Sequence, residues 1–206
     1  MKNSSTLWNQ YSNVYDVLNQ FYPYQEHLNM ICSLLNPKTD KIYLDVGCGT
    51  GNLAIKIHQT GARVIGIDYS IEMLDRARRK DESIRFEFAD INKKLNFEDS
   101  FFDGVITNNV ISYIENPNNM IREIYRVLKP KGKFIAATLR NNFSPYAVYK
   151  EHLKHVGLLH TFRIFFPLIG LGIHNMIILK KIKQNIYHTY DEKTFLNLIE
   201  QSGFLT

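Results

Sequence analysis

The stretch that indicates the fold of this chain is Leu44-Asp45-Val46-Gly47-Cys48-Gly49-Thr50-Gly51. An apolar run ends at a carboxylate, three glycines follow at alternate positions, and an amphipathic stretch begins at once. Glycine accepts a positive φ and, having no Cβ, lets a ligand come close to the backbone. Free N–H groups at the start of the next helix suit a carboxylate or a phosphate. The stretch therefore predicts a loop that holds a polar small molecule at the carboxyl end of a parallel strand.

The glycine spacing bears on which ligand this loop binds. Dinucleotide sites usually carry G-x-G-x-x-G, with a pyrophosphate at the helix N-terminus. Here the spacing is G-x-G-x-G, and Asp45 precedes it on the strand. A nicotinamide site is thus disfavoured but stays open, as does a tight turn that binds nothing.

Length and composition predict one globular domain in a reducing compartment. The chain has 206 residues, of which 45% are hydrophobic, enough for one substantial core. Cys32 and Cys48 do not make a disulfide framework, and the first 20 residues lack the pattern of a signal peptide. We therefore expect a cytoplasmic location.

The net charge of +5 is concentrated in one segment. Residues 150–183 hold six Lys/Arg and one Glu, which equals the excess of the whole chain. This is not the diffuse basic surface of a nucleic-acid binder, and the basic run Arg76–Lys80 fits the end of a helix. We therefore expect nucleic acid to be an unlikely partner. No histidine or cysteine cluster has the spacing of metal ligands.

Alternating apolar and amphipathic runs predict a doubly wound α/β fold with a mainly parallel sheet. The expected strands are Lys41–Val46, Arg63–Ile67, Ile84–Ala89, Phe102–Thr107 and Lys133–Leu139. The expected helices are 5–20, 23–35, Asn52–Gln59, Ser70 to Arg79, Asn116 to Leu128 and 191–202. A turn is expected at Lys129–Gly132. The domain 1–206 then divides into helices 1–37, a ligand-binding core 41–139, an insertion 144–188 and a C-terminal helix 191–206.

The insertion interrupts the alternation. Ile164–Leu179 has no Asp, Glu, Lys or Arg, but Pro167 and two glycines break it and it is too short to span a bilayer. Three interpretations stay open: a buried cover of the sheet, a lid over the site, and a lid that touches lipid.

Polar side chains follow four expected strands. Asp45, Asp68 and Asp90 end the first three, and Asn108 and Asn109 follow the fourth. Ligands of open α/β sheets bind outside the carboxyl ends of the strands. Turn chemistry alone explains three successive carboxylates poorly, so these side chains are candidate ligand contacts.

Several motifs resemble the class I, seven-strand methyltransferases that bind S-adenosylmethionine, in particular members acting on small molecules or lipids. The motifs are the glycine loop, Val64–Asp68, Phe102–Val110, Ile121–Lys133 and Tyr11–Asp16, in the family's order. The resemblance implies that Asp68 binds the ribose hydroxyls and that Asp90 and Ile91 lie by the adenine. Gly47, Gly49 and the backbone nearby, including Cys48 and Gly51, would face the methionine part. Asp45 would orient the loop and reach the ammonium group of the donor directly or through water, and Asn108 would line the methyl-donor pocket.

Further donor contacts are candidates with a plain alternative. Tyr69 and Met73 could pack on adenine, although Met73 could equally be helix core. Tyr11 and Tyr15 could contact the donor carboxylate, or form an aromatic i, i+4 pair over the core.

The chain departs from the family in two places. Asn108–Ile111 is not the D/N-P-P-Y/F motif of adenine-modifying enzymes, and the residues after Gly203 are too few for the usual C-terminal hairpin. We therefore expect five strands, with the edge of the fifth covered by the insertion, by Phe204–Thr206 or by a second subunit. The oligomeric state is not determined by the sequence.

The expected function is methyl transfer from S-adenosylmethionine to a small or amphipathic acceptor, which needs mainly alignment of the reactants. His152, His155 and His160 are weak candidates for a general base, and ordinary structural roles are the alternative. A non-catalytic module that binds a partner through the basic insertion is the rival hypothesis. Contact with a membrane surface is compatible with either.

Overall fold

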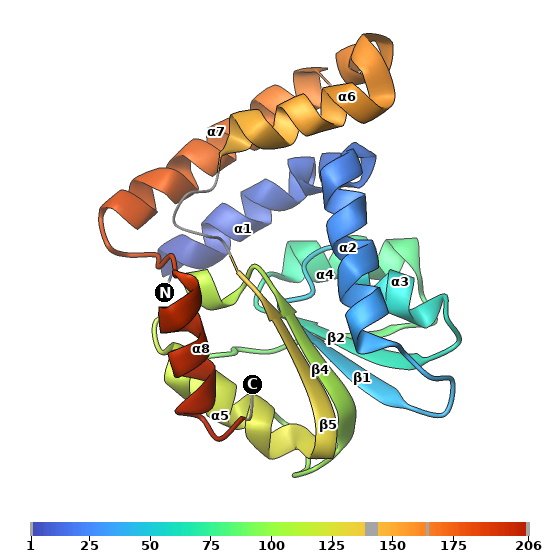
Figure 1. Ribbon diagram of the computed structural model, residues 1–206, viewed down its shortest axis with the longest axis vertical. Coiled ribbons are helices and arrows are strands. Elements are labelled where there is room, and N and C mark those ends of the chain that lie inside the picture. The colour runs from blue at the N-terminus through green and yellow to red at the C-terminus, as the bar shows by residue number, and fades with distance from the viewer. Residues whose placement is uncertain (1, 139–143, 164, 205–206) are drawn as a thin grey trace.

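A computed structural model describes residues 2–138, 144–163 and 165–204 of the chain (Figure 1). Its centre is a five-stranded parallel sheet in the order β3-β2-β1-β4-β5. The strands are β1 (Ile42–Val46), β2 (Arg63–Asp68), β3 (Arg85–Phe88), β4 (Phe102–Asn108) and β5 (Leu128–Ala137). This confirms the predicted α/β fold, with strand bounds close to those expected.

Helices cover both faces of the sheet, because successive side chains along a strand point alternately into two hydrophobic cores. Tyr43, Val64 and Ile106 belong to one core, with α2 (Tyr22–Leu35), α3 (Asn52–His58) and α4 (Ile71–Lys80). Leu44 and Val105 belong to the other, with α5 (Pro117–Val127) and α8 (Glu192–Glu200). Strands buried on both faces are typical of a parallel sheet.

The expected helix 5–20 changes its winding within its length. The structure has α1 (Lys2–Tyr15) followed by the 3-10 helix η1 (Asp16–Gln20). Asp16 Oδ1 accepts hydrogen bonds from Thr50 Oγ1 at 2.6 Å and from Lys80 Nζ at 2.5 Å. The tighter turn thus begins where the chain is tied to the glycine loop.

The turn expected at Lys129–Gly132 is present, but as a bulge inside β5. Register passes from Phe102 opposite Leu128 to Gly104 opposite Lys133, so the intervening residues of β5 oppose Asp103 alone. Lys131 adopts a φ of 66° there. A bulge leaves unpaired residues in a strand without ending it.

The insertion consists of α6 (Pro145–Arg163), kinked at Gly157, and α7 (Phe165–Lys183). The two helices pack against α2 and α1, above the carboxyl end of the sheet (Figure 1). A third apolar cluster, which includes Leu7, Tyr11, Leu171 and Ile178, fills the space between α1 and α7.

β5 forms one edge of the sheet, and within the described part of the chain no strand pairs with its outer side. The insertion, one of the three covers that we considered for this edge, lies on α1 and α2 instead. Phe204 packs on Phe134 with ring centroids 4.9 Å apart, so the described cover of β5 comes from the segment after α8. Leu205 and Thr206 lie outside the described residues.

Candidate functional site

A cavity of about 940 Å³ lies at the carboxyl ends of β1, β2 and β4, under α1 and α7. Its volume is at the upper end of the range for ligand pockets, about 300–1,000 Å³. The sequence-predicted residues that line it are Tyr11, Tyr15, Gly47, Gly49, Asp68, Tyr69, Met73, Asp90, Ile91 and Asn108. Most of the residues that the sequence predicted as ligand contacts therefore lie in the wall of one pocket.

The glycine loop is fixed by hydrogen bonds to β2. The N–H groups of Gly47 and Cys48 donate to the carbonyl oxygen of Ile67 at 2.8 and 2.9 Å. The N–H of Gly49 donates to Asp68 Oδ2 at 2.8 Å. A Cβ added at Gly49, whose φ is +54°, would meet only Tyr15 and Met73, at 3.8 and 3.9 Å. The open space in front of Gly49 is therefore pocket volume that a side chain would fill.

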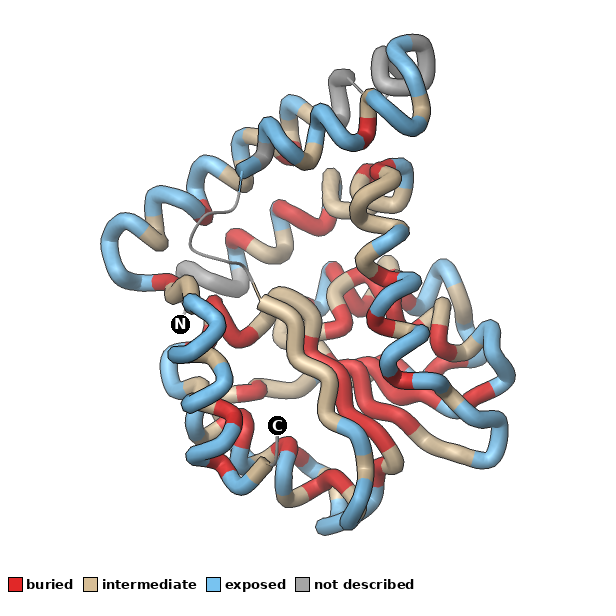
Figure 2. Tube along the Cα trace, viewed as in Figure 1, coloured by how far each residue is buried: buried red, intermediate tan, exposed pale blue. Residues whose placement is uncertain are grey.

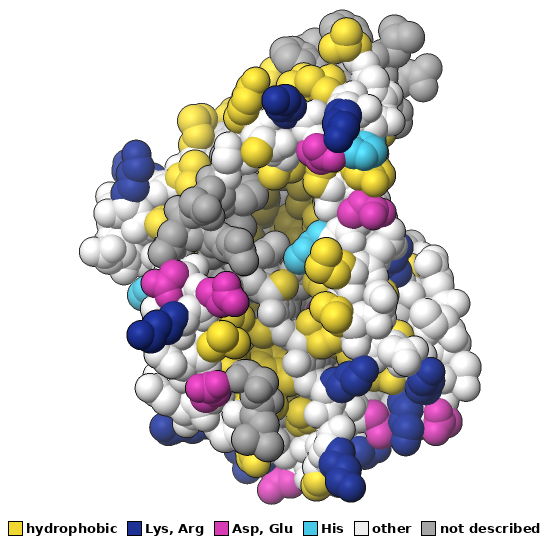
Figure 3. All heavy atoms as spheres, in the orientation of Figure 1, with side chains coloured by type: hydrophobic (Ala, Val, Ile, Leu, Met, Phe, Trp, Pro, Cys, Tyr) yellow, Lys and Arg dark blue, Asp and Glu magenta, His cyan; other side chains and the backbone are white. Residues whose placement is uncertain are grey.

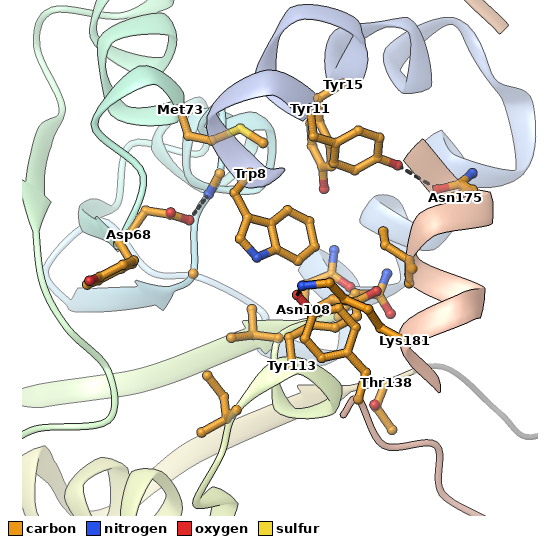
Figure 4. Close-up of a pocket in the computed structure, with 18 of the residues that line it drawn as sticks. Trp8, Tyr11, Tyr15, Asp68, Met73, Asn108, Tyr113, Thr138, Asn175 and Lys181 are labelled. Atoms are coloured by element: carbon orange, nitrogen blue, oxygen red, sulfur yellow. Dashed lines mark hydrogen bonds between the residues drawn. The ribbon is translucent and has the colours of Figure 1, made fainter. Parts of the chain in front are cut away.

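Asp68 links this loop to the start of α4. Its Oδ1 accepts the N–H of Ser70 at 2.8 Å, and the hydroxyl of Ser70 caps Met73 N–H. Burial raises the pKa of Asp68, while the N–H groups of Ser70 and Gly49 act in the opposite direction. Two backbone bonds hold the carboxylate at the pocket wall, and its remaining lone pairs can accept hydroxyl groups (Figure 4).

Three predicted loop residues do not line the pocket. Asp45 is 1% exposed and accepts the N–H of Ala54 in α3, which ties the end of β1 to that helix. Cys48 is buried in the core between the sheet and α3. A Cβ at Gly51 would meet Phe86 at 2.8 Å and Ala77 at 3.0 Å, so this glycine allows close packing of α4 and β3.

The pocket wall beyond Asp68 is formed by the segment after β3. Asp90, Ile91 and Asn92 line it, and Asp90 Oδ1 accepts the N–H of Asn92 at 3.1 Å. Tyr69 packs on Phe88 at a centroid distance of 5.4 Å. A carboxylate, a backbone N–H and apolar surface thus lie where the adenine was expected.

Tyr11 and Tyr15 form the expected aromatic pair and also line the pocket, where contact with the donor carboxylate stays a prediction. The rings lie edge to face, 5.3 Å apart, inside the cluster between α1 and α7, and both line the pocket. The hydroxyl of Tyr11 donates to Asn175 Oδ1 at 2.8 Å, which joins α1 to α7 (Figure 4). Met73 is likewise both 2% exposed and a lining residue.

Two candidate bases of the insertion, His152 and His155, do not line the pocket. His152 is buried, stacks on Phe21 at 4.3 Å and accepts the N–H of Tyr22 at 3.2 Å. His155 stacks on Tyr22 at 3.9 Å. Both lie in the contact between α6 and α2, because aromatic faces there accommodate the rings. The side chain of His160 lies outside the described residues.

Other lining residues were missed by sequence reasoning. Trp8 precedes Tyr11 and Tyr15 at helical spacing, so periodicity could have found it. His27 of α2 lines the pocket, and its Nε2 lies 2.8 Å from Asn108 Oδ1. Lys181 of α7 lines the opposite wall, with its Nζ 4.9 Å from the centroid of the Tyr187 ring. No local sequence pattern identifies His27 or Lys181 as a pocket residue.

The basic run at the end of α4 has a role beyond the helix dipole. Lys80 Nζ donates to the carbonyl oxygen and the hydroxyl of Thr50, each at 2.9 Å, to Asp16 and to Asn52 Oδ1 at 2.7 Å. Burial lowers the pKa of Lys80, and the bond to Asp16 partly opposes this. Lys80 thus clamps the end of the glycine loop to η1 and α3.

The side chains that line the pocket fit the chemical groups of S-adenosylmethionine. Asp68 presents a carboxylate for vicinal hydroxyls, Asp90 lies one strand further along the sheet, and the unfilled space at Gly49 lies between them and α1. Aromatic and apolar side chains line the remainder, which includes Tyr113, Ile178 and Ile182.

Comparison with known proteins agrees with this geometry. Residues 37–194 match the profile of a protein family described as "Methyltransferase domain". A ubiquinone biosynthesis O-methyltransferase of Coxiella burnetii is 32% identical over 52% of this chain and 47% of its own length. A demethylmenaquinone methyltransferase of Leptospira interrogans is 27% identical over 78% of this chain and 66% of its own length. The chain therefore spans about half to two thirds of these relatives.

Solved structures show the same fold. A SAM-dependent methyltransferase from Thermotoga maritima superposes with a TM-score of 0.68, at 18% identity, over 98% of this chain and 81% of that one. At this identity the likeness concerns the fold alone. Because the family profile matches most of the chain, the chain belongs to the methyltransferase-domain family.

Proposed function

We propose that this protein transfers a methyl group from S-adenosylmethionine to a small amphipathic acceptor. The observation that carries the proposal is the contact between the N–H of Gly49 and Asp68. It places the backbone of Gly49 and the carboxylate of Asp68 on one wall of a large cavity. The family match supports the same reaction class.

The residues divide the work of binding the donor. Asp68 accepts the ribose hydroxyls, Asp90 and the Ile91 backbone meet the adenine, and Gly47 and Gly49 give room for the methionine part. The bound donor supplies a methyl group already activated by its sulfonium charge, for in-line displacement. The enzyme then has mainly to align the acceptor, which proximity and orientation accomplish.

The other half of the cavity suits an acceptor with an apolar body and a polar head. Trp8, Tyr113 and Ile182 supply apolar surface, and Lys181 supplies a positive charge at one side. Two relatives carry names that refer to demethylmenaquinone and to ubiquinone biosynthesis, which supports an acceptor of this kind.

His27 is the group we assign to proton removal when the acceptor arrives protonated. It lines the pocket and is oriented by Asn108, at the end of the strand whose loop borders the donor site. A general base has to reach the proton that it removes, and His27 meets the requirement of position better than His152 or His155.

Ligand binding and labelling test the proposal. Isothermal titration with S-adenosylhomocysteine, S-adenosylmethionine and NAD should give binding of the first two only. Incubation with methyl-labelled donor and a panel of long-chain phenols, quinols, amines and carboxylates should then label an acceptor. Binding of NAD alone would overturn the assignment. Donor binding without labelling of any acceptor, including total lipid and small-molecule extracts, would favour the non-catalytic rival.

A further inference from the structure

The outer face of α7 is apolar although it is exposed. Ile169, Ile173, Met176 and Ile177 are 48%, 49%, 63% and 39% exposed and recur at helical spacing. Leu171 and Ile178 lie on the inner face and are buried against α1. Figure 2 shows exposed and intermediate residues alternating along this helix, with few buried ones. Contiguous apolar surface of this kind marks an interaction site.

Lysines border this stripe. Lys180 and Lys183 are exposed at the end of α7, and Lys150 and Lys154 are exposed on α6. Glu151 is the one acidic residue among positions 144–188, and its Oε1 lies 3.9 Å from Lys154 Nζ. Figure 3 shows hydrophobic side chains beside Lys and Arg on this part of the molecule. The excess positive charge of the chain therefore lies in α6 and α7, the same pair of helices that carries the exposed apolar residues of α7.

We propose that the outer face of α7, with the lysines of α6 and α7, docks on the surface of an anionic lipid bilayer. Apolar side chains with a rim of lysine are the features of helices that lie in the membrane interface. Lysine stems can lie along the apolar region while their ammonium groups meet lipid phosphates. No helix in the described part of the chain is long and apolar enough to cross a bilayer.

Charge favours a bilayer over a second copy of this chain. A two-fold contact brings the same patch of both copies together, and this patch carries the four exposed lysines but only one carboxylate, that of Glu151. Like charges brought together in this way repel, whereas an anionic lipid surface attracts all four lysines.

The docked orientation would place the mouth of the pocket near the lipid. Leu179 and Ile186 are 42% and 54% exposed, and both line the cavity. Lys181 lines it from the same helix. An amphipathic acceptor could then enter from the bilayer, a consequence that rests on the proposed function, whereas docking itself does not.

Vesicle binding of the full chain tests the inference. Co-sedimentation with vesicles of phosphatidylcholine and phosphatidylglycerol should retain the protein, and vesicles of phosphatidylcholine alone should not. Ile173→Glu with Met176→Glu, and separately Lys180→Glu with Lys183→Glu, should each weaken partitioning on the order of tenfold or more. All four side chains are exposed, so thermal melting should stay close to that of the wild type.

Matched variants elsewhere on the surface are the controls. Met30→Glu with Leu34→Glu changes two side chains of α2 that are 63% and 59% exposed. Lys94→Glu with Lys193→Glu reverses two exposed lysines outside the insertion. Both control variants should bind anionic vesicles within about twofold of the wild type, because only α6 and α7 are expected to contact the bilayer.

Three results would overturn the inference. The first is that the wild type does not bind anionic vesicles. The second is that the α7 variants and the control variants lose vesicle binding equally. The third is a dimer in size-exclusion chromatography that becomes monomeric in the variant Ile173→Glu with Met176→Glu. Titration with S-adenosylhomocysteine in the absence of vesicles keeps the two proposals apart. A protein that binds this ligand but no vesicle contradicts docking alone, and one that binds vesicles but not the ligand contradicts methyl transfer alone.

Discussion

Nε2 of His27 lies 2.8 Å from Oδ1 of Asn108, and this contact joins α2 to the carboxyl end of β4 at the pocket wall. An amide oxygen only accepts hydrogen bonds, so in this arrangement Nε2 carries the hydrogen. Nδ1 then keeps its lone pair, and it makes no hydrogen bond to any residue that the structure describes. The contact orients the imidazole, and in this tautomer Nδ1 is the nitrogen that can accept a proton.

Replacing His27 by Gln should lower turnover by about 10²–10⁴ while leaving the affinity for S-adenosylhomocysteine unchanged, because only proton removal is lost. Turnover is measured with the acceptor identified by labelling. His155→Gln is the control, because that ring stacks on Tyr22 outside the pocket. A His27→Gln enzyme with wild-type turnover would remove His27 from the mechanism.

Replacing Asp68 by Ala should weaken S-adenosylhomocysteine binding by about 1.5–3 kcal/mol, as expected for the loss of hydrogen bonds to a charged group. Calorimetry measures this loss. Ser70→Ala is the control, because it removes the cap of α4 yet leaves the carboxylate of Asp68 in place. It should lower stability by about 1 kcal/mol without a comparable change in affinity. Equal affinities of Asp68→Ala and wild type would contradict the ribose assignment.

Replacing Gly49 by Ala should abolish donor binding, because its Cβ would occupy the space between Tyr15 and Met73. Binding is followed by thermal shift with S-adenosylhomocysteine. The φ of +54° adds backbone strain, so the control has to carry similar strain away from the pocket. Gly157→Ala provides it, since Gly157 has a φ of +76° and no atom within 4 Å of an added Cβ. If both variants keep the ligand-induced shift, the donor does not bind at this loop.

Replacing Asp45 by Asn should change how stability depends on pH. Burial, together with the Asp68 carboxylate, raises the pKa of Asp45 to about 7. An unfolded aspartate titrates at about 3.9, so between these values the folded protein binds more protons than the unfolded chain. The contribution of Asp45 to stability is therefore full below about pH 4 and is lost as the pH rises through about 7.

The Asn variant has no such titration, so its melting temperature should fall less over this interval. Above pH 7 it should exceed that of the wild type by several degrees, since about 1 kcal/mol corresponds to about 2–4 °C in a protein of this size. Thermal melts across the interval measure both curves. Parallel curves would show that Asp45 is ionised in the folded protein at all these pH values.

The sequence by itself determined the sheet and one wall of the site. Glycine spacing, strand-length apolar runs and the carboxylates that end them are local signals, because backbone conformation and strand burial depend on neighbouring residues. Gly49, Asp68 and Asp90 were therefore placed at the same edge before any contact was known, and all three line the pocket. The edge of β5 is different: its cover by Phe204 instead of by the insertion follows from where α6 and α7 pack.

Only the tertiary structure decided the other wall. Tyr11 and Asn175 are 164 positions apart, and His27 and Asn108 are 81 apart, yet each pair is in hydrogen-bond contact. Such contacts depend on how α7 packs on α1 and how α2 packs on the sheet. A helix that is apolar on every side, as α7 is, carries no sequence signal for which face turns inward. Side-chain packing between helices selected Ile178 and Lys181 for the pocket and left Ile173 and Met176 exposed.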